Sequence, residues 1–301
     1  MAKTPITPLD LNFRGRLHSI ASYLIRHSTG IVLVESGPGS TLPALLDALA
    51  REGFSPRDVT HVLLTHIHRD HAGASGWFSR QGAEIIVHPV GAPHLLNPER
   101  LLASAGRIYG DQMHSLWGDF LPVLEPKLRV VQDREEVAIG ALRFLPVNTP
   151  GHAEHHYAWL FEDLCFSGDV GGIRVPGSRY LRLPMPPPEL NLERWQASLA
   201  RLRKEPFSRI APTHFGIYED AGWHLTQLEK ELVATSRWLQ NTMSSEPEAE
   251  EFRRAFASWM QSEGQNSQIA QDILDLYDVT NPPYMSADGL RRYWMKVRQA
   301  H

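Results

Sequence analysis

The 301-residue sequence has one cysteine, Cys165, and no long hydrophobic run. A single cysteine excludes an intramolecular disulfide and a metal site built from several thiolates. No segment approaches the roughly 20 apolar residues that a membrane-spanning helix needs. The N-terminal stretch MAKTPITPLDLNFRG has no apolar run of the kind found in signal peptides. From these absences we expect a cytoplasmic protein that does not act at a membrane.

The sequence also has fewer positively charged than negatively charged residues. The chain has 30 lysines and arginines against 34 aspartates and glutamates, which gives a formal net charge of −4. Binding to nucleic acid or to an anionic lipid surface generally needs a basic face. We therefore expect a small-molecule substrate and neither of those partners. The hydrophobic fraction of 42% is ample for a folded core.

Hydrophobic patterning divides the chain into a strand-rich part and a helical part. The predicted strands are residues 17–27, 31–35, 59–65, 83–89, 128–131, 141–149, 156–162, 164–169 and 207–214. The predicted helices are residues 41–53, 72–80, 191–204, 219–243, 247–263, 266–277 and 286–299, with short helices expected within 91–126. A loop rich in proline and glycine covers residues 171–190. This pattern predicts an α+β catalytic domain over residues 1–216 and a helical C-terminal region over residues 217–301.

The stretch LLTHIHRDHAG, residues 63–73, is the most informative part of the sequence. His66 and His68 are two residues apart at the end of a predicted strand, so both rings are expected to point to the same side. Asp70 and His71 follow where the chain must turn into the next helix. Imidazole combined with carboxylate suits zinc, iron or manganese rather than calcium. Because burying these groups unpaired would be costly, the stretch predicts a metal site.

Three later segments, NTPGHAEHH, FSGDVGG and APTHFG, repeat the arrangement of an apolar strand, a sharp turn and then His or Asp. They add His152, Asp169 and His214 to the candidate ligands. The full set is His66, His68, Asp70, His71, His152, Asp169 and His214. Two metal ions that share one carboxylate need about this number of ligands.

In their order along the chain, THIHRDHAG, TPGHAEHH, FSGDV and PTHFG resemble the motifs of the metallo-β-lactamase-fold hydrolases, over about residues 15–216. The resemblance implies a four-layer αββα sandwich with an appended helical C-terminal region. It is greatest to a poorly characterised branch of small hydrolases. The segment IVLVESGPGS resembles the early strand and loop of the family, with Glu35 where many relatives carry Asp.

The same resemblance implies a division of the ligands between two divalent metal ions. His66, His68 and His152 would hold the first ion, and Asp70, His71 and His214 the second, with Asp169 as the bridge. Zinc is the expected metal, with manganese and iron as alternatives. Two such ions lower the pKa of a bridging water to roughly 7, which makes hydroxide available at neutral pH.

These features predict a dinuclear metal-dependent hydrolase that cleaves an ester, thioester, lactone or phosphoester bond by attack of the bridging hydroxide. Asp70 is the candidate catalytic residue, because it can accept or deliver a proton. One alternative is a mononuclear iron oxygenase of the persulfide dioxygenase type, which would use only His66, His152 and Asp169. Another is a metal-binding scaffold without activity.

Two further points stay open at this stage. One of His155 and His156 is a candidate for orienting a metal ligand through a hydrogen bond. Segments that could cover the cleft contain Tyr109, His114, Trp117, Tyr180 and Tyr218, although side chains of these types more often serve packing than recognition. The amphipathic helices of the C-terminal region fit either a cover over the cleft or a contact in a homodimer.

Overall fold

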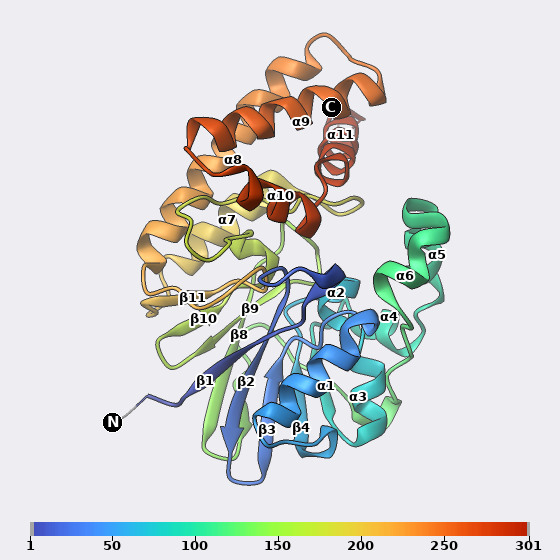
Figure 1. Cartoon of the computed structure of the whole chain (residues 1–301), viewed down its shortest axis with the longest axis vertical. Coiled ribbons are helices and arrows are strands. Elements are labelled where there is room, and N and C mark those ends of the chain that lie inside the picture. Colours follow the sequence, from blue (N-terminus) through green and yellow to red (C-terminus); the bar gives the residue numbers. More distant parts are fainter. Residues whose placement is uncertain (1–2, 300–301) are drawn as a thin grey trace.

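The computed structural model describes residues 3–299, apart from the side chains of residues 104, 105, 107–109 and 297–299. Two β-sheets lie face to face at its centre, with helices on both outer sides (Figure 1). The first sheet has the order β1-β2-β3-β4-β5-β6, and the second has the order β11-β10-β9-β8-β7.

Most of the first sheet is parallel, whereas most of the second is antiparallel. In the first sheet, the pairs β1–β2 and β2–β3 are antiparallel and the other pairs are parallel. Its strands are β1 (Ile6–Asp10), β2 (Ala21–His27), β3 (Gly30–Val34), β4 (Val59–Leu63), β5 (Glu84–Val87) and β6 (Leu128–Val130). In the second sheet, only β10 and β11 are parallel. Its strands are β7 (Val137–Ile139), β8 (Leu142–Asn148), β9 (Tyr157–Phe161), β10 (Leu164–Phe166) and β11 (Arg209–Ala211).

The helices fall into those that follow strands of the sandwich and those of the C-terminal region. The first set is α1 (Leu42–Arg51), α2 (Arg69–Ala72), α3 (Ser75–Gln81), α4 (Ala92–Leu96), α5 (Glu99–Tyr109), α6 (Met113–Trp117) and α7 (Leu192–Leu202). The second set is α8 (Ala221–Met243), α9 (Ala249–Asn266), α10 (Gln271–Thr280) and α11 (Pro283–Gln299). Among residues 3–299, none of these helices combines the length and the apolar character that crossing a bilayer requires.

Alternating side chains along the strands produce three packed apolar layers. In β2, Tyr23 and Ile25 point into the layer between the two sheets, while Leu24 packs on the side covered by α1 and α3. On the outer face of the second sheet, Cys165 packs in the layer that also contains Trp195 of α7. This is the alternation expected when both faces of a sheet are covered. The four-layer αββα sandwich predicted from the sequence is therefore confirmed.

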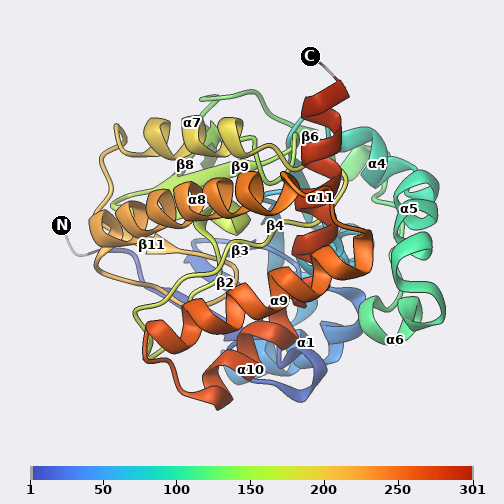
Figure 2. The ribbon, with the colours of Figure 1, turned by 90° about the horizontal axis from the view of Figure 1, so that it is seen from above.

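The C-terminal helices extend the outer layer of the second sheet. Leu228 of α8, Phe252 of α9 and Leu290 of α11 belong to the same hydrophobic cluster as the buried side chains of β8, β9 and β10. Trp238 of α8 adds aromatic contacts to Phe252 at 5.2 Å between ring centroids. Seen from above, α8 to α11 lie over one end of the two sheets (Figure 2). Helices α8, α9 and α11 thus share one core with the second sheet, whereas α10 packs on the loop that contains Ile173, Val175 and Tyr180.

Three local predictions differ from the structure. The sequence pattern does not predict strands β1 and β7, because β1 is an edge strand interrupted by Pro8 and β7 has only three residues. The predicted helix over residues 72–80 is instead two short helices, α2 and α3. The prediction that His66 and His68 sit at the end of a strand is wrong, because β4 ends at Leu63 and both residues lie in the loop before α2.

Candidate metal centre

The seven predicted ligands come from four connections at one end of the two sheets. The loop after β4 and helix α2 contribute four of them, and the other three follow β8, β10 and β11. The structure brings all seven side chains together in two groups that share Asp169. The first group is His66, His68, His152 and Asp169, and the second is Asp70, His71, His214 and Asp169. Within each group the candidate ligand atoms lie within 4.8 Å of one another.

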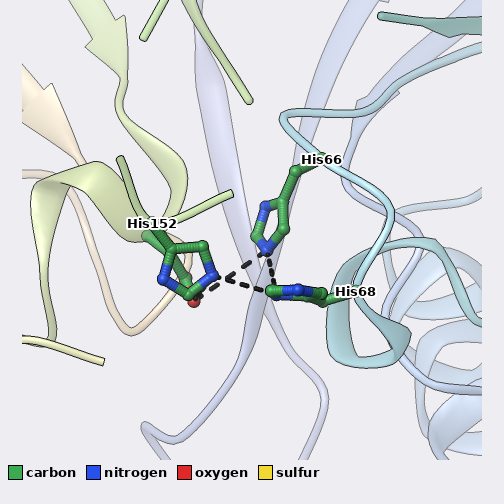
Figure 3. Close-up of side chains that lie close together, drawn as sticks. His66, His68 and His152 are labelled. Atoms are coloured by element: carbon green, nitrogen blue, oxygen red, sulfur yellow. Dashed lines mark hydrogen bonds and ion pairs between the residues drawn. The ribbon is translucent and has the colours of Figure 1, made fainter. Parts of the chain in front are cut away.

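In the first group, three imidazole nitrogens converge (Figure 3). Nδ1 of His68 lies 2.9 Å from Nε2 of His66 and 2.9 Å from Nε2 of His152. Oδ2 of Asp169 completes the group, 3.3 Å from Nε2 of His152 and 4.0 Å from Nε2 of His66. Three nitrogens and one oxygen around one point are a ligand set that suits a tetrahedral zinc ion.

In the second group, the other oxygen of Asp169 faces two histidines. Oδ1 of Asp169 lies 3.1 Å from Nε2 of His71 and 3.4 Å from Nε2 of His214. Oδ2 of Asp70 lies 3.6 Å and 3.5 Å from the same two nitrogens. One carboxylate therefore presents an oxygen to each group, which is the arrangement of a bridging ligand.

Two buried atoms support the assignment of a metal to this centre. Nε2 of His71 and Oδ1 of Asp169 are shielded from solvent and form no hydrogen bond, although they lie 3.1 Å apart. Buried polar atoms normally have a hydrogen-bond partner, because leaving them without one costs free energy. A cation between these atoms would satisfy both of them. The donor set thus fits a pair of divalent metal ions.

Burial and neighbouring charges set the protonation of the ligands. Burial lowers the pKa of His66 and lowers that of His152 to about 4, so both rings are neutral at pH 7 and keep a lone pair for a metal. Burial by itself would raise the pKa of Asp70, but His71 and His214 lower it to about 2. The pKa of His71 is raised although burial opposes this, because Asp169, Asp70 and Glu35 surround the ring.

Hydrogen bonds on the far side of the rings fix which nitrogen faces the metal position. Nδ1 of His152 lies 2.8 Å from the carbonyl oxygen of Pro184, and Nδ1 of His214 lies 2.8 Å from that of Ser19. A carbonyl oxygen can only accept, so each Nδ1 is the protonated nitrogen and each Nε2 is free to bind a cation. The two carbonyl groups are main-chain atoms and have no signature in the sequence.

Two glycines allow the turns that carry His152 and Asp169. Gly151 has a φ of 141°, and a Cβ there would lie 2.4 Å from backbone atoms of Trp195. Gly168 has a φ of 50°, and a Cβ there would lie 2.6 Å from Oγ1 of Thr65. Side chains at either position would clash and would be strained. Steric hindrance therefore explains why glycine precedes His152 in the sequence P-G-H and Asp169 in the sequence S-G-D.

The two histidines that follow His152 have different roles. Nδ1 of His156 lies 2.8 Å from Oγ1 of Thr149, and its Nε2 accepts a hydrogen bond from the backbone N–H of Val170 at 3.4 Å. His156 therefore stabilises the backbone next to Asp169 and does not orient the ring of a metal ligand. His155 reaches a cavity instead, where its Nε2 lies 3.5 Å from Oε2 of Glu189.

A cavity of about 600 Å³ opens directly above the candidate metal ligands. Its floor includes His68, Asp70, Asp169 and His214, Phe13 and Arg14 contribute to its lining, and most of its walls come from three other parts of the chain. These are the segment of α5 and α6, the proline-rich stretch 184–189, and residues 278–285 between α10 and α11. Cavities of this size hold small organic ligands.

Only some of the side chains predicted to cover the cleft do so. Trp117 lines the cavity, whereas Tyr180 packs against Tyr277 and Tyr218 donates a hydrogen bond to the carbonyl of Arg174. His114 is largely exposed beside Asp119, and the side chain of Tyr109 lies outside the described residues. The sequence does not single out residues 278–285, because no metal-ligand pattern marks them. Of the two roles open to the C-terminal helices, the structure supports a cover over the cleft.

Comparison with known proteins agrees with this geometry. The family model of the metallo-beta-lactamase superfamily matches residues 15–214. Among curated proteins, a metallo-beta-lactamase fold-containing protein of Sulfurisphaera tokodaii is 29% identical over 171 residues, which cover 54% of this chain and 64% of that protein. A hydroxyacylglutathione hydrolase of Xylella fastidiosa is 33% identical over 170 residues, which cover 56% and 49%. The matches span less than two thirds of the length of these relatives.

Solved structures extend the similarity to the whole chain. A metallo-beta-lactamase family protein of Thermus thermophilus superposes with a TM-score of 0.71 at 19% identity, covering 98% of this chain and 93% of that one. The archaeal superfamily protein of Sulfolobus tokodaii superposes with a TM-score of 0.60 at 22% identity, covering 77% and 86%. At these identities the superpositions concern the fold alone. The family match over residues 15–214, together with this fold, leads to one conclusion: the chain belongs to the metallo-beta-lactamase superfamily.

Proposed function

We propose that this protein is a dinuclear metal-dependent hydrolase whose substrate binds in the cavity above Asp169. The observation that carries the proposal is the division of seven ligand side chains into two complete groups that share one carboxylate. A single ion would leave the three further ligands of the other group without a metal to bind. Zinc is the proposed metal, because nitrogen donors outnumber oxygen donors in the first group.

Two bound cations would supply Lewis acidity, which activates water and polarises a carbonyl or phosphoryl group. The protein's own contribution is to hold the ligands rigidly and to keep the floor of the cavity sheltered. His66, His71 and Asp169 are almost completely buried, and Asp169 lines the floor of the cavity, so the cavity gives access to the centre. The carbonyls that accept from His152 and His214 hold those rings in one orientation.

Asp70 is the proposed proton carrier. It lines the cavity and is the more exposed of the two carboxylates in the second group. Because its Oδ2 lies 3.6 Å from Nε2 of His71 and 3.5 Å from Nε2 of His214 at the floor of the cavity, Asp70 is placed to accept a proton from the attacking water. It would then deliver that proton to the leaving group as the bond to the carbonyl breaks.

A thioester is the bond that we favour among those the site could cleave. The support is that two of the curated relatives are named hydroxyacylglutathione hydrolase, from Rhodopseudomonas palustris and Xylella fastidiosa. In thioester hydrolysis, water adds to the carbonyl carbon, the carbon–sulfur bond breaks, and the products are a carboxylic acid and a thiol. Carboxylic esters and lactones require the same geometry and remain in the substrate panel.

The test combines metal analysis with a substrate panel. Protein loaded with zinc is expected to retain two ions per chain and to hydrolyse thioesters faster than phosphodiesters. Asp70→Asn should reduce kcat by at least about 100-fold, while the exposed control Asp47→Asn should match the wild type. One bound iron, with oxygen uptake on glutathione persulfide and no hydrolysis, would instead support the mononuclear oxygenase. Two bound ions with no turnover of any substrate would support a scaffold without activity.

A further inference from the structure

The cavity above the metal ligands has apolar side chains on two walls. On one side, Phe13 stacks on Trp117 at 5.5 Å between ring centroids, with Leu116 beside them. On the other side lie Val279 and Met285, at the end of α10 and the start of α11. Polar side chains, among them Arg14, Arg100, Gln112 and Asn281, also line the cavity, so its apolar surface is divided into patches. These patches lie in the same cavity as the candidate metal ligands, so a bound ligand can contact both.

The wall from α10 and α11 belongs to a segment outside the matched family domain. The family model ends at residue 214, and residues 278–285 come more than 60 positions later. Polar contacts nevertheless join this segment to the loop beside the metal centre. The wall is therefore part of the cavity even though it is remote from the ligand motifs in the sequence.

These polar contacts connect α10 and α11 to the stretch that carries Pro184, the partner of His152. The carboxylate of Asp278 pairs with the buried guanidinium of Arg182. The hydroxyl of Tyr277 donates to the carbonyl of Tyr180 at 2.7 Å. The hydroxyl of Ser286 accepts a hydrogen bond from the backbone N–H of Met185 at 3.1 Å. The contacts fix the apolar wall relative to the metal ligands.

We propose that the substrate carries an apolar acyl group of medium length, and that Val279 and Met285 of the C-terminal region select it. This inference rests on the proposed hydrolase function and adds the chemical class of the acyl group. The cavity, about 600 Å³, is much larger than a reacting carbonyl needs and has the size of pockets that hold drug-like ligands. An alkyl chain placed between the two walls would leave water and gain the free energy of burial.

The expected signature is a dependence of rate on acyl chain length. Each buried methylene group is expected to raise kcat/KM about two- to four-fold. In a series of thioesters of N-acetylcysteamine with acetyl, butanoyl, hexanoyl and octanoyl groups, the leaving group is constant. The octanoyl thioester has six more methylene groups than the acetyl thioester and should exceed it by about 60- to 4,000-fold. A flat series, or one that falls with length, would overturn the proposal, as would faster turnover of a hydroxyacyl thioester of glutathione.

Two variants assign the effect to the C-terminal wall. Met285→Gln keeps the length of the side chain but introduces an amide, and it should reduce the octanoyl-to-acetyl ratio at least about five-fold. Met295→Gln makes the same change on the same helix at an exposed position outside the cavity, and it should keep the wild-type ratio. Val279→Thr, which is nearly isosteric, should also lower the ratio. Wild-type ratios in both Met285→Gln and Val279→Thr would overturn the assignment.

A binding measurement separates this inference from the proposed function. Octyl and ethyl thioethers of N-acetylcysteamine have no thioester bond to hydrolyse, so calorimetry can follow their binding without turnover. The octyl compound should bind more tightly, with a more negative heat-capacity change from burial of apolar surface. Loss of all hydrolytic activity with this binding pattern intact would refute only the proposed function. Equal binding of both thioethers would refute only the acyl-group inference.

Discussion

Oε1 of Glu35 lies 3.1 Å from Nδ1 of His71, and neither side chain is exposed to solvent. The same oxygen accepts hydrogen bonds from the hydroxyls of Thr65 at 2.5 Å and Thr213 at 3.2 Å. Glu35 also has a φ of 70°, which is costly for a residue with a side chain and is often found at functional positions. The carboxylate thus orients His71 from behind, as acidic side chains commonly do for metal-ligating histidines.

Glu35→Gln should weaken metal binding in the second group. The amide keeps the size of the side chain but removes the charge that holds the proton of His71 on Nδ1, so affinity for one of the two ions should fall about 10–100-fold. Competition with a chromogenic chelator measures this directly. Glu136→Gln, on the surface, serves as the control and should bind two ions like the wild type. Unchanged affinity at both sites would show that Glu35 does not support the centre.

Metal stoichiometry should distinguish the bridging ligand from a ligand of one group. Asp169 faces both groups, whereas His214 belongs only to the second. After dialysis, elemental analysis should give two ions per chain for the wild type, one for His214→Ala and fewer than one for Asp169→Ala. His114→Ala, an exposed histidine, should retain two. Two ions in Asp169→Ala would contradict the shared-carboxylate arrangement.

Stability should depend on pH through His224, which lies outside the metal ligands. Its Nε2 lies 2.7 Å from the carbonyl oxygen of Gly171, and burial lowers its pKa to about 4. An unfolded chain binds a proton at this histidine below about pH 6.5, whereas the folded chain does so only near pH 4. The free energy of unfolding should therefore fall as the pH drops from 6.5 to 4, by about 3 kcal/mol for this group.

The contribution of His224 can be isolated by a variant that does not titrate. His224→Gln retains a donor for Gly171 but has no ionisable group, so its unfolding free energy should fall less steeply between pH 6.5 and 4. Urea unfolding should be measured at several pH values in the same chelating buffer for both proteins. The contributions of the other buried histidines to the unfolding free energy are then common to both and cancel in the difference. His114→Gln should behave like the wild type. Equal slopes in His224→Gln and the wild type would refute this assignment.

Two glycines in the C-terminal helices should respond oppositely to alanine. A Cβ at Gly289 of α11 would lie 1.9 Å from the carbonyl oxygen of Met185, so Gly289→Ala must separate the helix from the loop beside the cavity. We expect a loss of about 1–3 kcal/mol of stability. A Cβ at Gly222 of α8 would meet no atom within 4 Å, so Gly222→Ala should be neutral or stabilising by up to about 1 kcal/mol. Thermal unfolding of both variants tests this contrast.

Local sequence was sufficient to predict most of the strands, most helices and the identity of the candidate ligands. Apolar runs mark strands that must be covered on both faces, as in β2 and β9. The crowding of three histidines and an aspartate within THIHRDH is a chemical signal that does not depend on the fold. Edge strands such as β1 and β7 escape prediction because they are short or interrupted, and local pattern is weak there.

The family resemblance already implied how the ligands divide between two groups, whereas only the tertiary structure decided their distances and what lies above them. The division of Asp169 between two groups depends on the relative positions of β4, β8, β10 and β11, which are set by long-range sheet pairing. The carbonyls of Ser19 and Pro184 are main-chain atoms, so the identity of the side chain does not reveal their contacts with His214 and His152. The apolar wall of Val279 and Met285 reaches the cavity because α11 shares the core of the second sheet and α10 packs on the loop that contains Ile173 and Tyr180. A sequence pattern records which groups are present, while distances between remote segments arise from packing of the whole chain.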